Sequence, residues 1–240
     1  MMDSLKERLR ELADYYEVDG FIKDDPVQFP HRYTEKKDVE ISAFVTSWIS
    51  YGNRKAIISK ANFLDAKFSG SPYKFLKNRE FEVWQGSRES FYRFYKYADL
   101  YDLFEALHKI YLENRDMEEA VLRVAGDSLV SKVQALFAGV KGVPSVSGDS
   151  ACKRISMFLR WMVRKNSPVD LGLWSSFGSE ELVIPLDTHV WQQAVKLGIT
   201  SRKAQNMQTA REITDFFRPI FGDDPARGDF ALFGFGVNSK

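Results

Sequence analysis

Two side chains in the second half of the chain have the types that covalent catalysis by an amine needs. Lys153 lies in Ser-Ala-Cys-Lys-Arg, and Asp187 lies in Ile-Pro-Leu-Asp-Thr-His-Val-Trp. A neutral lysine amine can attack an electrophilic carbon and form a Schiff base. A nearby carboxylate can then assist proton transfer or stabilise positive charge on the substrate. Lys153 and Asp187 are therefore the candidate catalytic residues.

The lysine must lose its proton before it can attack, because an unperturbed lysine has a pKa of about 10.4. Burial or cationic neighbours lower that pKa, and Arg154 and Arg160 lie close to Lys153 in the sequence. The segment 150–165 has the pattern of an amphipathic helix, with Asp149 or Ser150 as its natural cap. We expect this helix to present Lys153 near its start.

A positive stripe runs along the expected helix, because Lys153, Arg160 and Arg164 fall opposite its apolar residues. The helix follows the glycine-rich stretch 138–148, and free amides at a helix start attract phosphate. The pattern predicts a contact surface for a nucleic-acid backbone. Its residues would be Gly148, Arg154, Arg160 and Arg164. Spacing alone leaves open the alternative of an ordinary solvated helix face.

Asp187 follows a stretch that is apolar and stiffened by Pro185, and it precedes a second amphipathic segment. Its carboxylate can meet the free amides at the start of that helix, which keeps the carboxylate ionised. A plain helix cap with no catalytic role explains the same pattern. His189, two residues later, could reach a phosphate or cap the same helix.

The elements that position these residues are helices, since apolar residues recur at helical spacing along most of the chain. Phe91 to Phe94 fits this spacing too. Residues 80–84 and 182–186 could each form a short strand without an evident partner. We therefore expect an all-α fold in which residues 1–240 form one compact unit. Two lobes, 38–148 and 1–37 with 149–240, would enclose a cleft.

Composition narrows the classes of function. The chain has 240 residues with 34 Lys and Arg against 33 Asp and Glu, so a globally basic surface is excluded, but a local one is not. The single cysteine, Cys152, excludes an internal disulfide, a cysteine-ligated zinc site and an iron–sulfur cluster. No secretion signal or membrane-spanning segment is recognisable. The sequence predicts a cytoplasmic protein with no metal, no other cofactor and no membrane partner.

The sequence from Pro185 to Val190, with Lys196-Leu197-Gly198 after it, resembles a motif of the helix-hairpin-helix GPD superfamily of DNA glycosylases. That motif carries the essential aspartate of the superfamily, and Lys153 corresponds to the upstream catalytic lysine of its bifunctional members. The separation of the two residues is more similar to the archaeal 8-oxoguanine glycosylase branch than to the endonuclease III branch. Residues 152–164 and 229–234 are similar to signatures of a poorly characterised bacterial family allied to the superfamily.

The resemblance implies a two-lobed helical glycosylase fold and a partner, double-stranded DNA with a damaged base, with 8-oxoguanine as one candidate. The base would be flipped out and its N-glycosidic bond cut. Lys153 would attack C1′ of the sugar, Asp187 would stabilise charge or move a proton, and the Schiff base would permit strand cleavage. The alternative is a non-catalytic DNA- or RNA-binding protein that keeps the glycosylase-like fold.

The resemblance extends to Ser50-Tyr51-Gly52-Asn53-Arg54, which sits like the turn that inserts a polar residue into the duplex. It implies that Asn53 is the inserted residue and that Arg54 binds nucleic acid, although Gly52-Asn53 could simply end a helix. Tyr51, Trp48 and Trp191 would stack on the extruded base, although large aromatic residues more often fill a core. The Leu-Pro-Gly-Val-Gly hairpin of the superfamily is absent from the sequence.

Overall fold

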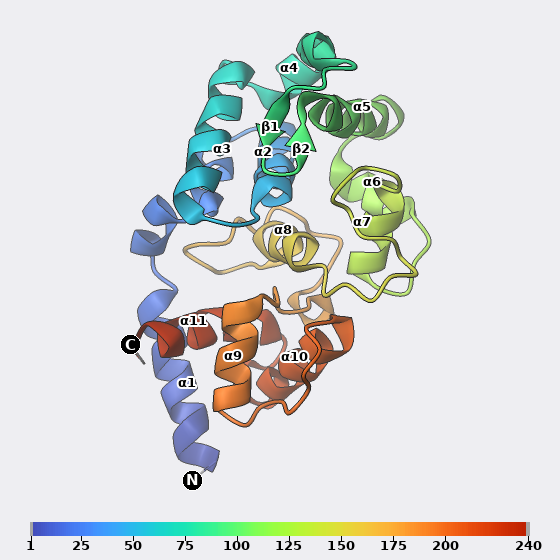
Figure 1. Ribbon diagram of the computed structural model, residues 1–240. Coiled ribbons are helices and arrows are strands. Elements are labelled where there is room, and N and C mark those ends of the chain that lie inside the picture. The colour runs from blue at the N-terminus through green and yellow to red at the C-terminus, as the bar shows by residue number, and fades with distance from the viewer. Residues whose placement is uncertain (1, 239–240) are drawn as a thin grey trace. The chain divides into compact units, whose positions relative to one another are not determined.

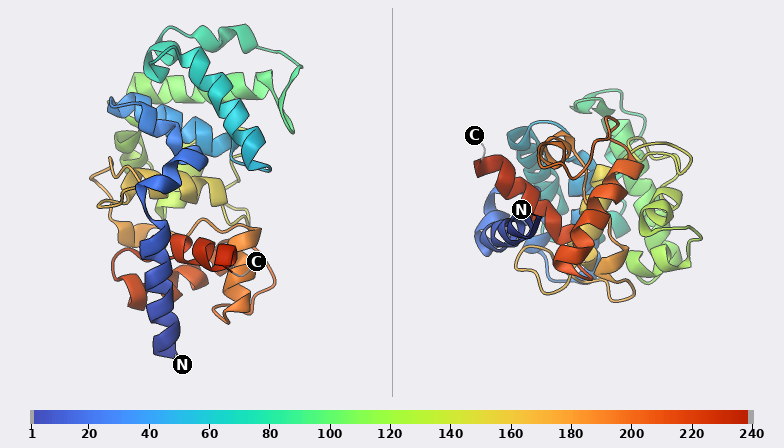
Figure 2. Two further views of the ribbon diagram at one scale, coloured as in Figure 1. Left: turned by 90° about the vertical axis from the view of Figure 1, so that its left-hand side faces the viewer. Right: turned by 90° about the horizontal axis from the view of Figure 1, so that it is seen from below.

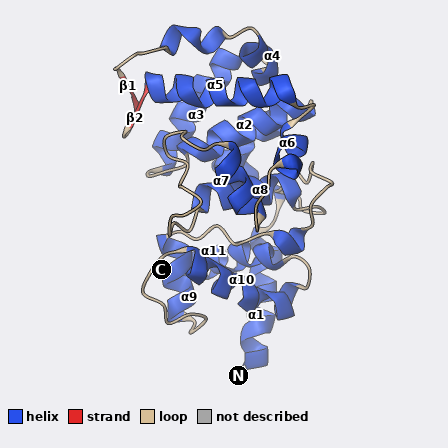
Figure 3. Ribbon diagram, turned by 90° about the vertical axis from the view of Figure 1, so that its right-hand side faces the viewer, coloured by secondary structure: helices blue, strands red, loops and turns tan. Residues whose placement is uncertain are grey.

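The computed structural model describes residues 2–238, which form two compact units (Figure 1). Unit 1 combines Met1–Lys23 with Ser147–Lys240, and unit 2 is Asp24–Val146. Helices dominate both units, and strands occupy only one short hairpin among the described residues (Figure 3). The prediction of an all-α fold is therefore confirmed. None of the helices in residues 2–238 is long and apolar enough to cross a membrane.

Unit 2 is built around α2 (Lys36–Ile49), whose residues from Asp38 onward are buried. A helix that is covered on all sides needs apolar residues around its whole circumference, and α2 has them. On one side Phe44 stacks on Phe137 with ring centroids 3.9 Å apart. The other elements of the unit are η2 (Pro26–Gln28), η3 (Pro30–Arg32), α3 (Arg54–Phe68), α4 (Pro72–Lys77), η4 (Glu80–Trp84), β1 (Ser90–Tyr92), β2 (Tyr95–Lys96), α5 (Tyr97–Glu113), α6 (Met117–Arg123) and α7 (Leu129–Leu136).

One buried carboxylate in unit 2 has its partners supplied by neighbouring elements. Glu40 on α2 accepts hydrogen bonds from the Tyr111 hydroxyl at 2.8 Å and from the amides of Met117 and Glu118 at the start of α6. Such partners offset much of the cost of burying a charge. This carboxylate therefore joins α2, α5 and α6 and has a structural role.

The predicted boundary between the lobes is wrong at one end. Residues 24–37 belong to unit 2, whereas the sequence grouped them with 149–240. The reason is packing, since Pro26, Val27 and Phe29 are buried and η2 and η3 contact α2. The chain also forms two compact units rather than one.

Unit 1 brings the two ends of the chain together. The helix α1 (Met2–Tyr16) packs against α11 (Gly228–Asn238) and crosses it, as the blue and red helices of Figure 2 show. The Tyr16 ring meets the edge of Phe233 at 5.4 Å, and a Cβ at Gly234 would clash with Tyr16. The other elements are η1 (Asp19–Asp24), which ends in unit 2, α8 (Lys153–Val163), η5 (Ser179–Glu181), α9 (Thr188–Lys196), α10 (Met207–Phe221) and η6 (Pro225–Arg227).

Three local predictions are wrong. Residues 80–84 form the 3-10 helix η4. Residues 182–186 form no strand in the part of the chain that the structure describes. The Ile184 amide there donates a hydrogen bond to the Thr214 hydroxyl and not to a neighbouring strand. Phe91 to Phe94 belongs to the β1–β2 hairpin rather than a helix, with Tyr92 paired to Tyr95. Side chains in a hairpin alternate between its two faces, whereas those on one side of a helix recur every three to four residues. Four residues are too few to distinguish these two patterns.

Candidate functional site

Lys153 is the first residue of α8, and the backbone before it has an unusual conformation. Cys152 lies in the left-handed region with φ of +50°, which a residue other than glycine adopts at a cost of about 1–3 kcal/mol. The Cys152 amide donates to the Ser150 hydroxyl at 3.1 Å, and Ser150 forms an isolated bridge with Asn206. Neither Asp149 nor Ser150 is the cap, because the helix begins three residues after Ser150. The surrounding contacts thus fix the point at which α8 begins.

The Lys153 side chain is half-buried, and within residues 2–238 no hydrogen bond or ion pair engages its amine. Asp187 is also half-buried and caps α9, as the sequence predicts. One of its carboxylate oxygens accepts a hydrogen bond from the Val190 amide at 2.9 Å. Lys153 and Asp187 therefore belong to the same compact unit, each at the start of a helix.

A second carboxyl group, Asp229 in the first turn of α11, is affected by the charges of both Lys153 and Asp187. Burial raises the pKa of Asp229 to about 6, the ion pair with Arg160 opposes this rise, and the charge of Asp187 adds to it. The Lys153 charge also acts on the Asp229 carboxyl, in the direction that favours ionisation. We refer to Lys153, Asp187 and Asp229 as the Lys153 site. The sequence did not predict a role for Asp229, because the only signal at this residue was its place in the 229–234 segment that is similar to a family signature.

The protonation of Asp229 makes a testable contribution to stability. Because its pKa is raised from 3.8 to about 6, the folded chain holds more protons than the unfolded chain between these values. Stability contributed by this group therefore falls as the pH rises through that window. Asp229→Asn is expected to gain up to about 3 kcal/mol relative to wild type between pH 4 and pH 7, measured by urea denaturation. A difference that does not vary with pH would contradict this, and Asp215→Asn, at an exposed position of α10, is the control.

The predicted positive stripe on α8 does not exist, because Arg160 and Arg164 are 4% and 1% exposed. All residues from Ile155 to Val163 are buried as well, so α8 has no solvated face. A helical pattern places polar residues on one side but does not show what covers that side. Here the carboxylate of Glu17, just after α1, and carboxylates from the second half of the chain cover it. The nucleic-acid-binding role predicted for Arg160 and Arg164 is therefore wrong.

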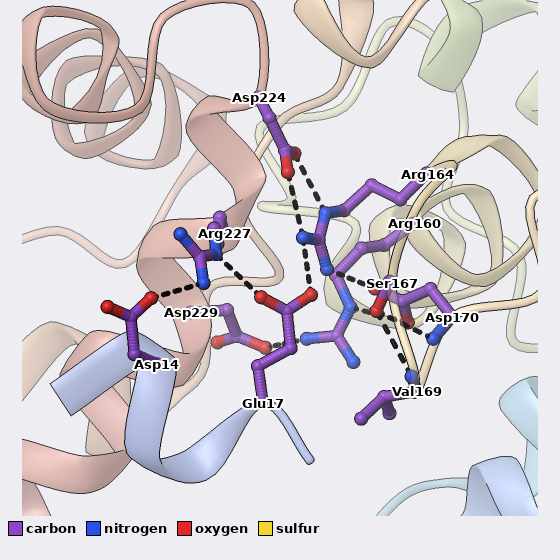
Figure 4. A network of polar contacts seen from close by, with 10 residues as sticks. All are labelled: Asp14, Glu17, Arg160, Arg164, Ser167, Val169, Asp170, Asp224, Arg227 and Asp229. Carbon is purple, nitrogen blue, oxygen red and sulfur yellow. Dashed lines mark hydrogen bonds and ion pairs between the residues drawn. The ribbon is translucent and has the colours of Figure 1, made fainter. Parts of the chain in front are cut away.

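Both arginines instead take part in a chain of ion pairs, the arginine network, which Figure 4 shows. Arg164 donates to Glu17 at 2.6 Å, to Asp170 at 2.5 Å and to both carboxylate oxygens of Asp224 at 2.8 Å. Arg160 pairs with Asp170 at 3.2 Å and also with Asp229. At the other end, Arg227 connects Glu17 to Asp14. The network consists of Asp14, Glu17, Arg160, Arg164, Asp170, Asp224, Arg227 and Asp229.

The ionisation of the network follows from these contacts. Burial works against the charge on Arg164, but Asp224, Asp170 and Glu17 outweigh it and raise the pKa of Arg164. Burial likewise raises the pKa of Glu17, but Arg164 and Arg227 overcome it and lower that pKa overall. Arg164 and Glu17 therefore stay charged, and the network holds α1, α8 and the C-terminal elements in one arrangement. It also positions Asp229 at the Lys153 site through Arg160.

An open pocket of about 760 Å³ in unit 1 is lined largely by this network and by the residues around it, including Lys165, Asn166 and Asp223. Lys153, Asp187 and Asp229 do not line it. The pocket is therefore separate from the Lys153 site.

The remaining predicted residues of unit 1 differ in exposure. Gly148 is exposed in the loop before α8, and Arg154 is half-buried beside Cys152. His189, the second residue of α9, is exposed. Trp191 is half-buried, and its indole N–H donates to the Arg202 carbonyl at 2.9 Å. Its ring position is thus fixed by the loop after α9.

In unit 2 two predictions need correction. Asn53 does not end a helix, because its side-chain oxygen accepts a hydrogen bond from the Ala56 amide and caps α3, and its side chain is exposed. Trp48 is 3% exposed and donates to the Lys141 carbonyl at 2.8 Å, so it belongs to the core and not to an open base pocket. Tyr51 is 47% exposed, and Arg54 is exposed at the start of α3.

Potential metal ligands do not gather in the described chain. No group of three or more histidine, cysteine, aspartate or glutamate side chains in residues 2–238 is arranged to hold a metal ion.

The fold and these side chains define an all-α protein with a lysine and two carboxyl groups near the starts of three helices. The chain belongs to the family described as "Protein of unknown function (DUF2400)", whose family model matches residues 25–238. That match spans unit 2 and includes all three residues of the Lys153 site. Comparison with curated proteins and with solved structures found no match.

Proposed function

We propose that the chain is a DNA glycosylase with lyase activity at the resulting abasic site. The observation that carries this proposal is the Lys153 amine, unpaired within residues 2–238 and close enough to Asp229 for its charge to act on that carboxyl together with Asp187. An amine and two carboxyl groups that are linked through their charges offer the types of side chain that Schiff-base chemistry needs. The resemblance of residues 185–190 to the glycosylase motif supports the same assignment.

The proposed reaction begins when the neutral Lys153 amine attacks C1′ of the damaged nucleoside. The N-glycosidic bond breaks, its electron pair goes to the base, and the base leaves after taking up a proton. The bond between C1′ and the ring oxygen then opens as a proton passes from the attached amine to that oxygen, which leaves a protonated Schiff base between Lys153 and the sugar. Loss of a C2′ proton expels the 3′ phosphate and cleaves the strand, and water releases the unsaturated sugar from Lys153.

The two carboxyl groups suit different steps. Asp187 accepts a hydrogen bond from a backbone amide at the start of α9, which fixes the carboxylate in place, and a fixed carboxylate can stabilise positive charge on the sugar. Asp229 has a pKa of about 6, which suits a group that takes up and returns a proton near neutral pH. Asp229 would therefore serve the proton transfers, while Asp187 stabilises the charge.

Asp187→Asn separates the charge of this side chain from its capping role. Asparagine caps helices about as well as aspartate, so the thermal midpoint of unfolding is expected to stay close to wild type. The rate of base release is expected to fall by about 10²–10⁴-fold, because the developing positive charge loses its counter-charge. Single-turnover assays on duplexes with 8-oxoguanine, uracil, thymine glycol or an abasic site measure it. If wild type acts on none of them, or the variant matches wild type, the proposal is wrong.

A non-catalytic nucleic-acid-binding protein is the second candidate. The bond from Val190 explains Asp187 as a cap without catalysis, and exposed cationic and aromatic side chains remain on unit 2. This candidate predicts DNA or RNA binding that weakens steeply with salt, with no product from any of these substrates.

A further inference from the structure

An aromatic column in unit 2 leads from the core to the surface. The Trp48 ring stacks on Tyr95 with centroids 3.8 Å apart and planes 25° apart. Tyr95 contacts Phe94 at 4.4 Å, and Phe94 contacts Tyr51 at 5.4 Å. Phe94 and Tyr51, at the outer end, are 46% and 47% exposed. We name these four rings the aromatic column.

The exposed end of the aromatic column is held in place. The Tyr92 hydroxyl donates to the Tyr51 carbonyl at 2.6 Å, and Lys141 donates to the Phe94 carbonyl at 2.8 Å. The Arg93 guanidinium lies 4.8 Å from the centre of the Tyr51 ring. A ligand that stacks on these rings would therefore find them largely ordered, which lowers the entropic cost of binding.

The backbone around the outer rings is specialised for this arrangement. Arg93, in the turn of the β1–β2 hairpin, has φ of +54°, a conformation usually left to glycine. Gly52 has φ of +100°, and a Cβ there would lie 2.7 Å from the Arg93 guanidinium. A Cβ at residue 52 would therefore require the Arg93 side chain to shift from its present position. Strain of this kind is often found at functional positions.

Basic residues predominate in the two segments that carry the outer rings, although Asp99 lies nearby, where it pairs with Lys141 at 2.7 Å. Residues 50–56 and 90–96 include Arg54, Lys55, Arg93 and Lys96 and no acidic residue. The interior of a protein–protein interface is usually depleted of charge, whereas single-stranded nucleic acid combines flat bases with negative phosphates. Rings for stacking, with the Arg93 guanidinium against Tyr51 and further basic residues in the same two segments, therefore favour a nucleic acid as the occupant.

We propose that Tyr51 and Phe94, with Arg93 beside them, form a stacking site for an unpaired base of a nucleic-acid strand, whose phosphates meet the surrounding cations. The inference rests on the proposed nucleic-acid binding of the chain but not on chemistry at Lys153. It also gives a substrate preference, since single-stranded or bulged DNA offers an unpaired base and a fully paired duplex does not.

The test uses the full chain and a short DNA oligonucleotide that contains one 2-aminopurine, presented as a single strand, as a bulge and within a perfect duplex. Wild type is expected to bind the first two more tightly and to quench their fluorescence by stacking. Phe94→Leu and Tyr51→Leu are each expected to weaken this binding by about 10-fold and to reduce the quenching. Phe94→Tyr keeps an aromatic ring and should retain both. Tyr15→Leu, on α1 where Tyr15 is 72% exposed, is the matched control.

Unchanged affinity and quenching in both leucine variants would overturn the stacking site. If those variants then also alter the oligomeric state, a second copy of the chain is the occupant instead. Lys153→Gln distinguishes this inference from the proposed function, because it is expected to keep the stacking signal. If the wild-type chain shows the stacking signal but yields no cleavage product, only the glycosylase proposal is contradicted.

Discussion

Lys153→Gln is expected to abolish strand cleavage at a damaged base or abasic site. Glutamine has a similar length but its amide nitrogen is not a nucleophile, so no Schiff base can form. Lys153 is half-buried at the start of α8 and has no ion pair within residues 2–238, so its replacement should leave the fold intact. Single-turnover cleavage of lesion-containing duplexes, with thermal unfolding in parallel, measures the two effects separately.

The control for this experiment is Lys203→Gln, the same change at an exposed lysine of unit 1. It is expected to cleave at the wild-type rate. Base release without strand cleavage in the Lys153 variant would mean that water, not the lysine, attacks the sugar. Full strand cleavage by the variant would exclude Lys153 as the nucleophile.

Arg164→Met is expected to destabilise the chain by about 3–5 kcal/mol, a large part of the stability of a typical domain. Methionine retains much of the buried apolar stem but leaves Glu17, Asp170 and Asp224 without their shared partner. Urea denaturation followed by circular dichroism measures this loss. A change below about 1 kcal/mol would show that the arginine network is not needed for stability.

The loss should depend on pH. The pKa of Glu17 is lowered in the folded chain, so the stability that this group contributes is present above its unfolded pKa and is lost as the pH falls. The difference between Arg164→Met and wild type is therefore expected to be largest near pH 7 and to narrow toward pH 4. Arg202→Met, which breaks an exposed pair with Glu212, is the control and should cost about 0–1 kcal/mol at every pH.

Local sequence signals predicted local structure well. The apolar spacing of residues 150–165 indicated a helix, and α8 occupies Lys153–Val163. The position of Asp187 before an amphipathic segment indicated a cap, and the Val190 amide makes that bond. Both depend on interactions within a few residues, which the order of side chains determines.

Contacts between distant parts of the chain could not be predicted in the same way. Arg164 is buried because Glu17 reaches it from the residue after α1 and Asp224 reaches it from the loop after α10. Asp229 could not be assigned to the Lys153 site either, since its pKa depends on burial and on Arg160. A single sequence gives the positions of these charges along the chain but not their partners.

The central claim is that the Lys153 amine forms a covalent bond with the sugar of its substrate. Sodium borohydride reduces a Schiff base to a stable amine, so the wild-type chain is expected to become linked to DNA that carries an abasic site or a damaged base. Mass spectrometry of the digested adduct should place the sugar on the peptide that contains Lys153. Absence of an adduct with every substrate, or an adduct of equal yield in Lys153→Gln, would contradict the claim.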